Sequence, residues 1–176
     1  MLHFAAPMDG HMDTGTAVHE LRTIERSAGW AMGELDGCLL VVWRAQPTPD
    51  AFRTRNRALA DLVDRYPGRS ALVEVVEPTS LPPANETRRV AMQVFKDLGD
   101  RLSAIGFVIE GSQMKQSVNR AILTTMMFFV KQMQPTKVNK SIAEAASWVR
   151  GRVGGTPDLE PRLARALDEL RRSIQS

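Results

Sequence analysis

The stretch "GWAMGELDGCLLVVWRAQP", residues 29–47, decides the fold class. Asp36-Gly37 lies between two strand-like runs, and such a dipeptide favours the tight turn of a β-hairpin. The second run, from Cys38 to Trp43, is nearly continuous in apolar residues, as expected of an inner strand. The stretch therefore predicts a hairpin whose second strand lies inside a sheet. The preceding "HELRTIERS" is a candidate edge strand.

Helical and strand-like segments alternate after this hairpin. Thr48 or Asp50 can cap the first helix, and Ser141 with Glu144 forms a capping box before the last helix of this series. Such alternation predicts an α/β fold in which right-handed crossovers build a mixed, mostly parallel sheet flanked by helices. In chain order we expect a helix over 48–68, a strand over 71–78, a helix over 85–105, a strand over 106–111, a helix over 112–133, a strand over 136–140 and a helix over 141–155.

The C-terminal segment "TPDLEPRLARALDELRRSIQS" predicts an extra amphipathic helix. Its apolar stripe consists of Leu159, Leu163, Leu167, Leu170 and Ile174. Because apolar stripes require cover, this helix either docks on its own chain or dimer or binds a partner, and we expect docking. We divide the chain into a disordered lead over 1–18, an α/β domain over 19–152, and a linker with the C-terminal helix over 153–176.

Composition narrows the function classes. The chain has 176 residues, a net charge of +3, 43% hydrophobic and 24% charged residues, as in an ordinary globular protein. The arginines at 53, 55, 57, 65 and 69 alternate with acids, which indicates a solvated helix face and no nucleic-acid surface. With a single cysteine, Cys38, in an apolar run, we expect a buried thiol and no Cys-based metal site. We expect a cytoplasmic protein without a membrane span, metal or cofactor.

The junction "GFVIEGSQMKQSVNR", residues 106–120, resembles a phosphate loop but lacks the necessary spacing. A Walker loop needs two glycines before Lys-Ser/Thr, and a nucleophile elbow needs Gly-x-Ser-x-Gly. We expect Gly111 to permit a bend and Ser112 to cap the following helix. An anion at Gly111 and Ser112 is the functional alternative, because helix N-termini favour negative charge.

An enzyme remains an alternative. The three histidines lie in or beside the N-terminal lead, so catalysis in the body would depend on carboxylates, lysines and hydroxyls. A small hydrolase or transferase could use Glu77, Thr79, Glu110 and Ser112, where ligands of such sheets usually bind. The opposing interpretation places the two glutamates at the rim of the sheet, one of them facing Arg88, Arg89 or Arg120.

The helix expected over 112–133 is apolar around its last turns. Methionine-rich surfaces adapt to irregular partners, so this region is a candidate contact for a dimer or another protein. Burial beneath the C-terminal helix is the structural alternative, and an apolar-ligand carrier with a cavity behind this helix is the third functional class. The candidate surface comprises Met126, Met127, Phe128, Phe129 and Met133.

The order of elements, "GFVIEG" and "AEAASWV" (Ala143 to Val149) resemble the STAS/SpoIIAA-like domains of bacterial signalling. The likeness covers roughly residues 28–150. It implies a non-enzymatic regulator that binds an unidentified protein partner, and we expect a homodimer. Antagonists of this family carry a phosphorylated serine at a helix start, but the matching region here, "EPTSLPPANETRR", has Asn85 there. Thr79 and Ser80 are the candidate phosphorylation sites, near Arg88 and Arg89.

Overall fold

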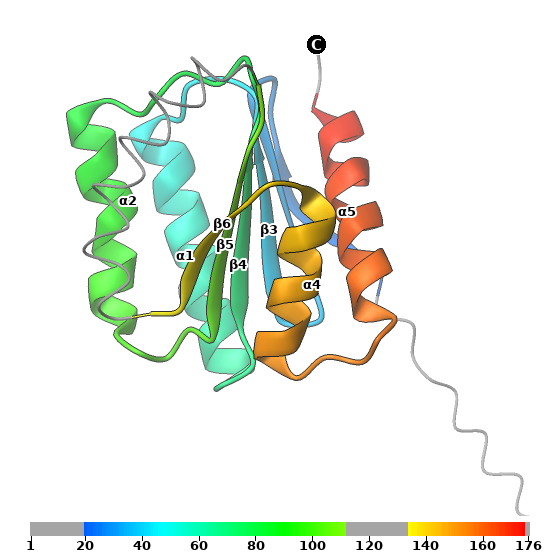
Figure 1. The fold of residues 1–176 in the computed structure, drawn as a ribbon. Coiled ribbons are helices and arrows are strands. Elements are labelled where there is room, and N and C mark those ends of the chain that lie inside the picture. Colours follow the sequence, from blue (N-terminus) through cyan, green and yellow to red (C-terminus); the bar gives the residue numbers. More distant parts are fainter. Residues whose placement is uncertain (1–19, 112–133, 175–176) are drawn as a thin grey trace, which may run out of the picture.

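The computed structural model describes residues 20–111 and 134–174. In these ranges six strands form one sheet whose spatial order follows the chain order (Figure 1). The first three strands pair antiparallel, and the later neighbours pair parallel. The predicted mixed α/β sheet and its edge strand are therefore confirmed. The strands are β1 (Arg22–Arg26), β2 (Trp30–Leu35), β3 (Cys38–Trp43), β4 (Ala71–Val76), β5 (Ala104–Ile109) and β6 (Thr136–Asn139).

The predicted hairpin turn joins β2 to β3. Leu35 pairs with Cys38, so Asp36 and Gly37 alone form the loop. Both have positive φ angles, 48° and 77°, as a type I′ turn requires. A Cβ atom at Gly37 would lie 2.9 Å from the carbonyl oxygen of Arg69, so both the backbone and the space favour glycine.

Two helical layers cover the sheet. Helices α1 (Pro49–Arg65) and α2 (Asn85–Leu98) lie on one face, and α4 (Ile142–Val153) and α5 (Leu159–Ser173) lie on the other (Figure 1). The crossovers from β3 to β4 and from β4 to β5 advance in the same direction. Right-handed connections therefore place α1 and α2 on the same face.

The central strands alternate between two apolar cores. Leu39 and Val41 of β3 pack toward α1 and α2, whereas Leu40 and Val42 pack toward α4 and α5. All residues of β3 and β5 are buried. This burial on both faces explains why β3 reads as a continuous apolar run.

Two predicted helix caps are formed. Thr48 Oγ1 accepts from the backbone N–H of Ala51 at 3.2 Å. Ser141 Oγ accepts from the N–H of Glu144 at 3.2 Å, and the Glu144 carboxylate accepts from the N–H of Lys140 at 2.8 Å. Each cap satisfies an amide that the first helical turn leaves free.

The prediction of one helix over 85–105 is wrong at its C-terminal end. Helix α2 ends at Leu98, and Gly99 follows with a φ angle of 58°, a conformation that favours glycine. Leu102 continues the spacing of one apolar residue in every four, but it lies in the loop after α2, where its side chain is buried. Ala104 already belongs to β5. The apolar spacing of the sequence thus continues past the end of the helix, which is why the sequence predicted too long a helix.

The C-terminal helix docks on its own chain, as we expected. Its apolar stripe is buried in the same core as β3 and α4. Gly33 of β2 permits the close approach, because a Cβ atom there would lie 3.3 Å from Leu170 Cδ2 and 2.7 Å from Leu21 Cδ1. None of the described helices is both long enough and apolar enough to cross a membrane. The expected lead over 1–18 lies outside the described residues.

Cys38 is fully buried, which confirms the sequence prediction. Burial raises the pKa of its thiol to about 12, and the charges of Asp36 and Glu34 add to this effect. Because the thiolate is the reactive form, we expect alkylation at pH 8 to proceed only through unfolding. The rate of iodoacetamide labelling, followed by mass spectrometry, should equal the labelling rate of the unfolded chain multiplied by the unfolded fraction that circular dichroism measures. Rapid labelling of the native protein, compared with a guanidinium-unfolded control, would contradict this.

Candidate functional site

Two glutamates at the carboxyl end of the sheet converge on one arginine of α5. Glu77 follows β4, and Glu110 follows β5. Arg171 Nε lies 3.0 Å from Glu77 Oε1, and Arg171 Nη2 donates to Glu110 Oε1 at 2.8 Å. Arg44 donates to both carboxylate oxygens of Glu77, from Nε at 2.7 Å and from Nη2 at 3.2 Å. The two carboxylates therefore face arginines other than those that the sequence suggested.

Arg44 also connects this cluster to the end of α5. Its Nη2 donates to the carbonyl oxygen of Arg171 at 3.1 Å, and its Nη1 donates to that of Ile174 at 3.2 Å. The last carbonyls of a helix have no partner within the helix, so a guanidinium there stabilises the helix end. Glu77 and Glu110 thus take part in the contacts that hold α5 against the carboxyl end of the sheet.

The loop over 77–84 is held against the segment that follows β3. Thr79 Oγ1 donates to the carbonyl oxygen of Arg44 at 2.7 Å, and Ser80 Oγ donates to that of Ala45 at 3.0 Å. Gln46 Nε2 donates to the carbonyl oxygen of Pro82 at 2.8 Å. These contacts position Leu81, whose side chain is 61% exposed.

The two candidate phosphorylation sites differ in access. Thr79 is exposed, whereas Ser80 is only 4% exposed. The predicted bend at Gly111 is present, with a φ angle of 120°, and a Cβ atom there would lie 3.2 Å from Pro78 Cβ. Ser112 lies outside the described residues, so the anion site at Gly111 and Ser112 stays a prediction.

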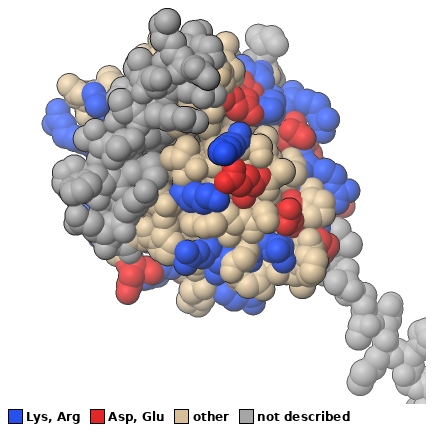
Figure 2. Space-filling model, in the orientation of Figure 1, with Lys and Arg blue, Asp and Glu red and all other residues tan. Residues whose placement is uncertain are grey.

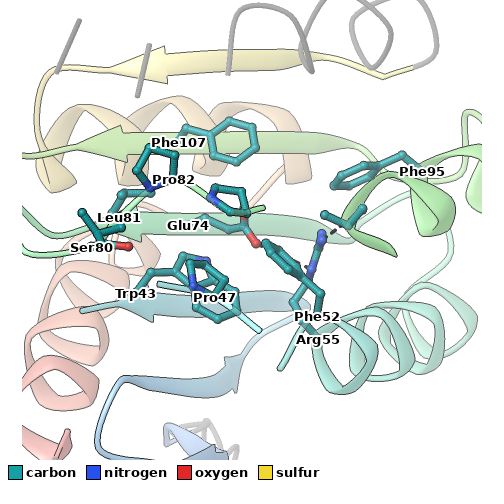
Figure 3. A pocket seen from close by; sticks show the side chains of 13 residues that line it. Trp43, Pro47, Phe52, Arg55, Glu74, Ser80, Leu81, Pro82, Phe95 and Phe107 are labelled. Atoms are coloured by element: carbon teal, nitrogen blue, oxygen red, sulfur yellow. Dashed lines mark hydrogen bonds and ion pairs between the residues drawn. The ribbon is translucent and has the colours of Figure 1, made fainter. Parts of the chain in front are cut away.

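A cavity of about 60 Å³ opens beneath this loop, on the α1 and α2 side of the sheet (Figure 3). Trp43 and Phe107 come from strands, while Phe52 and Phe95 come from α1 and α2. Figure 3 shows these rings around the charged side chains of Arg55 and Glu74. The cavity therefore combines an apolar wall with one buried cation and one buried carboxylate.

Arg55 and Glu74 form a buried pair with incomplete hydrogen bonding. They are 1% and 5% exposed, and Arg55 Nε lies 3.6 Å from Glu74 Oε1, beyond hydrogen-bond distance. Arg55 Nη2 donates to the carbonyl oxygen of Ala91 at 3.0 Å. Its guanidinium carbon lies 4.7 Å and 5.1 Å from the ring centres of Phe52 and Phe95. Arg55 Nε and Nη1 and Glu74 Oε1 have no hydrogen-bond partner.

Burial shifts both groups away from their charged forms. Burial raises the pKa of Glu74, although the charge of Arg55 and a hydrogen bond from Trp43 act in the opposite direction. Burial likewise lowers the pKa of Arg55, which the charge of Glu74 partly offsets. A guanidinium keeps its proton in proteins, so Glu74 is the group of this pair that can titrate.

The expectation of a solvated arginine face is wrong for Arg55. The sequence contained two signals of its burial. Arg55 lies three residues after Phe52 and four before Leu59, on the buried stripe of α1. Glu74 is the only charged residue in the otherwise apolar strand "ALVEVV". A charge on each of two buried faces indicates that both side chains need a partner, because an unpaired buried charge is costly.

The predicted contact surface, residues 126, 127, 128, 129 and 133, lies outside the described residues. Lys and Arg alternate with Asp and Glu over the described part of the face in Figure 2. Within residues 20–111 and 134–174, no group of three or more His, Cys, Asp and Glu side chains is placed to hold a metal ion.

A comparison with solved structures finds an uncharacterized protein of the DUF3478 family from Shewanella loihica PV-4, described as having a SpoIIAA-like fold. The two chains are 12% identical with a TM-score of 0.47, and the match covers 69% of this chain and 94% of that chain. The mixed α/β sheet and its helices, which the sequence predicted, are shown by the structure of the chain itself. No protein-family model and no curated protein matches the chain.

We predict that Arg44 contributes more than Arg171 to holding Glu77, because only Arg44 makes two hydrogen bonds to it. Glu77→Gln should cost about 2 kcal/mol of unfolding free energy. Urea unfolding of Arg44→Met, Arg171→Met and the two double variants with Glu77→Gln measures each coupling energy. An equal or larger coupling for Arg171 would contradict the expected order.

Proposed function

We propose that this chain is a non-enzymatic regulatory module that acts by binding another protein. The observation that carries the proposal is Leu81, which is the exposed large hydrophobic side chain of the described residues, on a loop pinned by side-chain hydrogen bonds. The proposal includes the bacterial cytoplasmic signalling role and the homodimer that we expect from the sequence.

The loop is suited to binding because its shape is set in advance. Prolines at 78, 82 and 83 restrict the backbone, and hydrogen bonds from Thr79, Ser80 and Gln46 fix it at three points. A preorganised loop loses little conformational entropy when a partner binds. The partner that fits is a protein with an apolar pocket that accepts the Leu81 side chain.

The carboxyl end of the sheet supports a binding role over the hydrolase alternative. Glu77 and Glu110 accept from arginines, and the Thr79 hydroxyl donates to a backbone carbonyl. Among the described residues that line the cavity below, Ser80 supplies the only hydroxyl, and this hydroxyl donates to the carbonyl oxygen of Ala45. A nucleophile needs an adjacent base to take its proton, and these contacts provide none.

Phosphorylation of Thr79 is the regulatory step that this arrangement favours. Thr79 is exposed, and a phosphate on its oxygen would remove the hydrogen bond to the carbonyl of Arg44. The added negative charge would then change both the position of the loop and the surface around Leu81. Ser80 is buried, so its modification would first require the loop to open.

We predict that Leu81→Asp abolishes partner binding without unfolding the chain. Crosslinking and pull-down from the native cell should recover a protein with the wild type and lose it with Leu81→Asp. The matched control is Pro67→Asp, which also adds an acid at an exposed apolar position, beyond the C-terminal end of α1. Titration calorimetry with the purified partner should show about tenfold weaker binding or worse, as for a central apolar contact.

A Phe128→Glu, Phe129→Glu variant tests the surface that the sequence predicted on the Met-rich segment. Loss of the same partner would place both regions in one interface. Equal recovery of every protein by the wild type and Leu81→Asp would overturn the role of the loop. Light scattering of each variant reads the expected homodimer, and a wild type that remains monomeric at all concentrations would refute that part.

A further inference from the structure

We propose that the cavity beneath the loop over 77–84 binds a small, uncharged molecule that bears a carboxamide on a short apolar body. Arg55 supplies the donors for the carboxamide oxygen, and Glu74 supplies the acceptor for its N–H. The inference goes beyond partner binding, because it concerns the interior of the cavity and needs no second protein.

Several buried polar atoms of residues that line the cavity have no hydrogen-bond partner. Arg55 Nε and Nη1 and Glu74 Oε1 lack partners although both side chains are more than nine-tenths buried. Leaving buried charged groups without hydrogen bonds is costly, and native proteins rarely retain them without a reason. Both residues line the same cavity, so one guest can reach both.

The charges of Arg55 and Glu74 favour a neutral guest. Arg55 and Glu74 carry opposite charges at 3.6 Å, so the site as a whole is neutral when both are ionised. A charged guest would leave one buried charge uncompensated, which is unfavourable in a poorly solvated site. A neutral group that accepts a hydrogen bond on one side and donates one on the other supplies the missing hydrogen bonds of both residues. A carboxamide has this pattern.

The size of the cavity and the chemistry of its wall further limit the guest. A volume of about 60 Å³ exceeds the roughly 15 Å³ that one water needs, so the cavity holds several water-sized groups. Phe52, Phe95 and Phe107, with Trp43, supply the apolar wall. Hydrophobic and aromatic walls with a few fixed polar groups are typical of small-molecule sites. The guest is therefore a short amide with an aliphatic part.

The test uses three probes with the same carbon skeleton on the full chain: isobutyramide, isobutyrate and isobutylamine. Proton–nitrogen spectra report the Arg55 Nε–H and the Trp43 indole N–H, the latter because Trp43 lines the same cavity. Isobutyramide should shift both signals saturably, with a dissociation constant of about millimolar, as expected for so few atoms. The acid and the amine should bind about tenfold more weakly or worse.

Two variants make the test specific. Glu74→Gln leaves the charge of Arg55 unbalanced, so the preference should reverse and isobutyrate should bind better than isobutyramide. Val76→Phe fills the cavity from a partly buried lining position and leaves the pair intact, so it should abolish the shifts. If a thermal melt shows that Glu74→Gln is not folded, the effect of Val76→Phe on the shifts decides whether the probe binds in the cavity.

Four results would overturn the proposal. Tighter binding of isobutyrate than isobutyramide to the wild type would show that the site prefers anions. No shift with any probe at its solubility limit would mean that water alone fills the cavity. Shifts that persist in Val76→Phe would place binding elsewhere. A Gly-Gln-Gly peptide that binds more tightly than isobutyramide would replace the free small molecule with a partner's side chain.

Discussion

Burial of the central strands on both faces is the constraint on which the rest of this structure depends. Strands β3 and β5 expose none of their residues to solvent, so each face of the sheet requires its own helical layer. The crossover helices α1 and α2 can cover only one face, because right-handed connections place them together. The other face is covered by α4 and α5 from the end of the chain. The amphipathic tail is therefore part of the core.

This second layer also determines the chemistry at the carboxyl end of the sheet. Packing of α5 brings Arg171 to Glu77 and Glu110, and it brings the last carbonyls of α5 to Arg44. Hydrogen bonds join Arg44 to Glu77 and Arg171 to Glu110, and Arg171 Nε forms an ion pair with the buried carboxylate of Glu77.

The buried pair of Arg55 and Glu74, beneath the same loop, is not satisfied in this way. Burying two charges without full hydrogen bonding costs stability, so we expect the first cluster to stabilise the fold more than the second. The two clusters therefore have different physical roles although both consist of arginine and glutamate.

Much of the fold could be predicted from the sequence, because its signals are local. The turn at Asp36-Gly37, the cap at Thr48 and the apolar stripe of α5 each depend on a few adjacent residues. The end of α2 was missed, because Leu102 preserves the helical spacing while it packs from a loop.

The candidate site was harder to predict, because its contacts join residues far apart in the chain. Arg55 and Glu74 belong to different elements, and Arg171 meets Glu110 across 61 positions. Charge and spacing marked these residues as unusual in their own segments. Only the packing of the layers shows which of them meet.

The agreement between strand order and chain order has a consequence for synthesis on the ribosome. Each strand is added beside the one made just before it, so the sheet can assemble from the N-terminus as the chain emerges. The face that α4 and α5 cover stays bare until residues 142–173 have emerged from the ribosome. A ribosome that stalls before that point presents a sheet with an uncovered apolar face, which is a substrate for chaperones or a nucleus for aggregation.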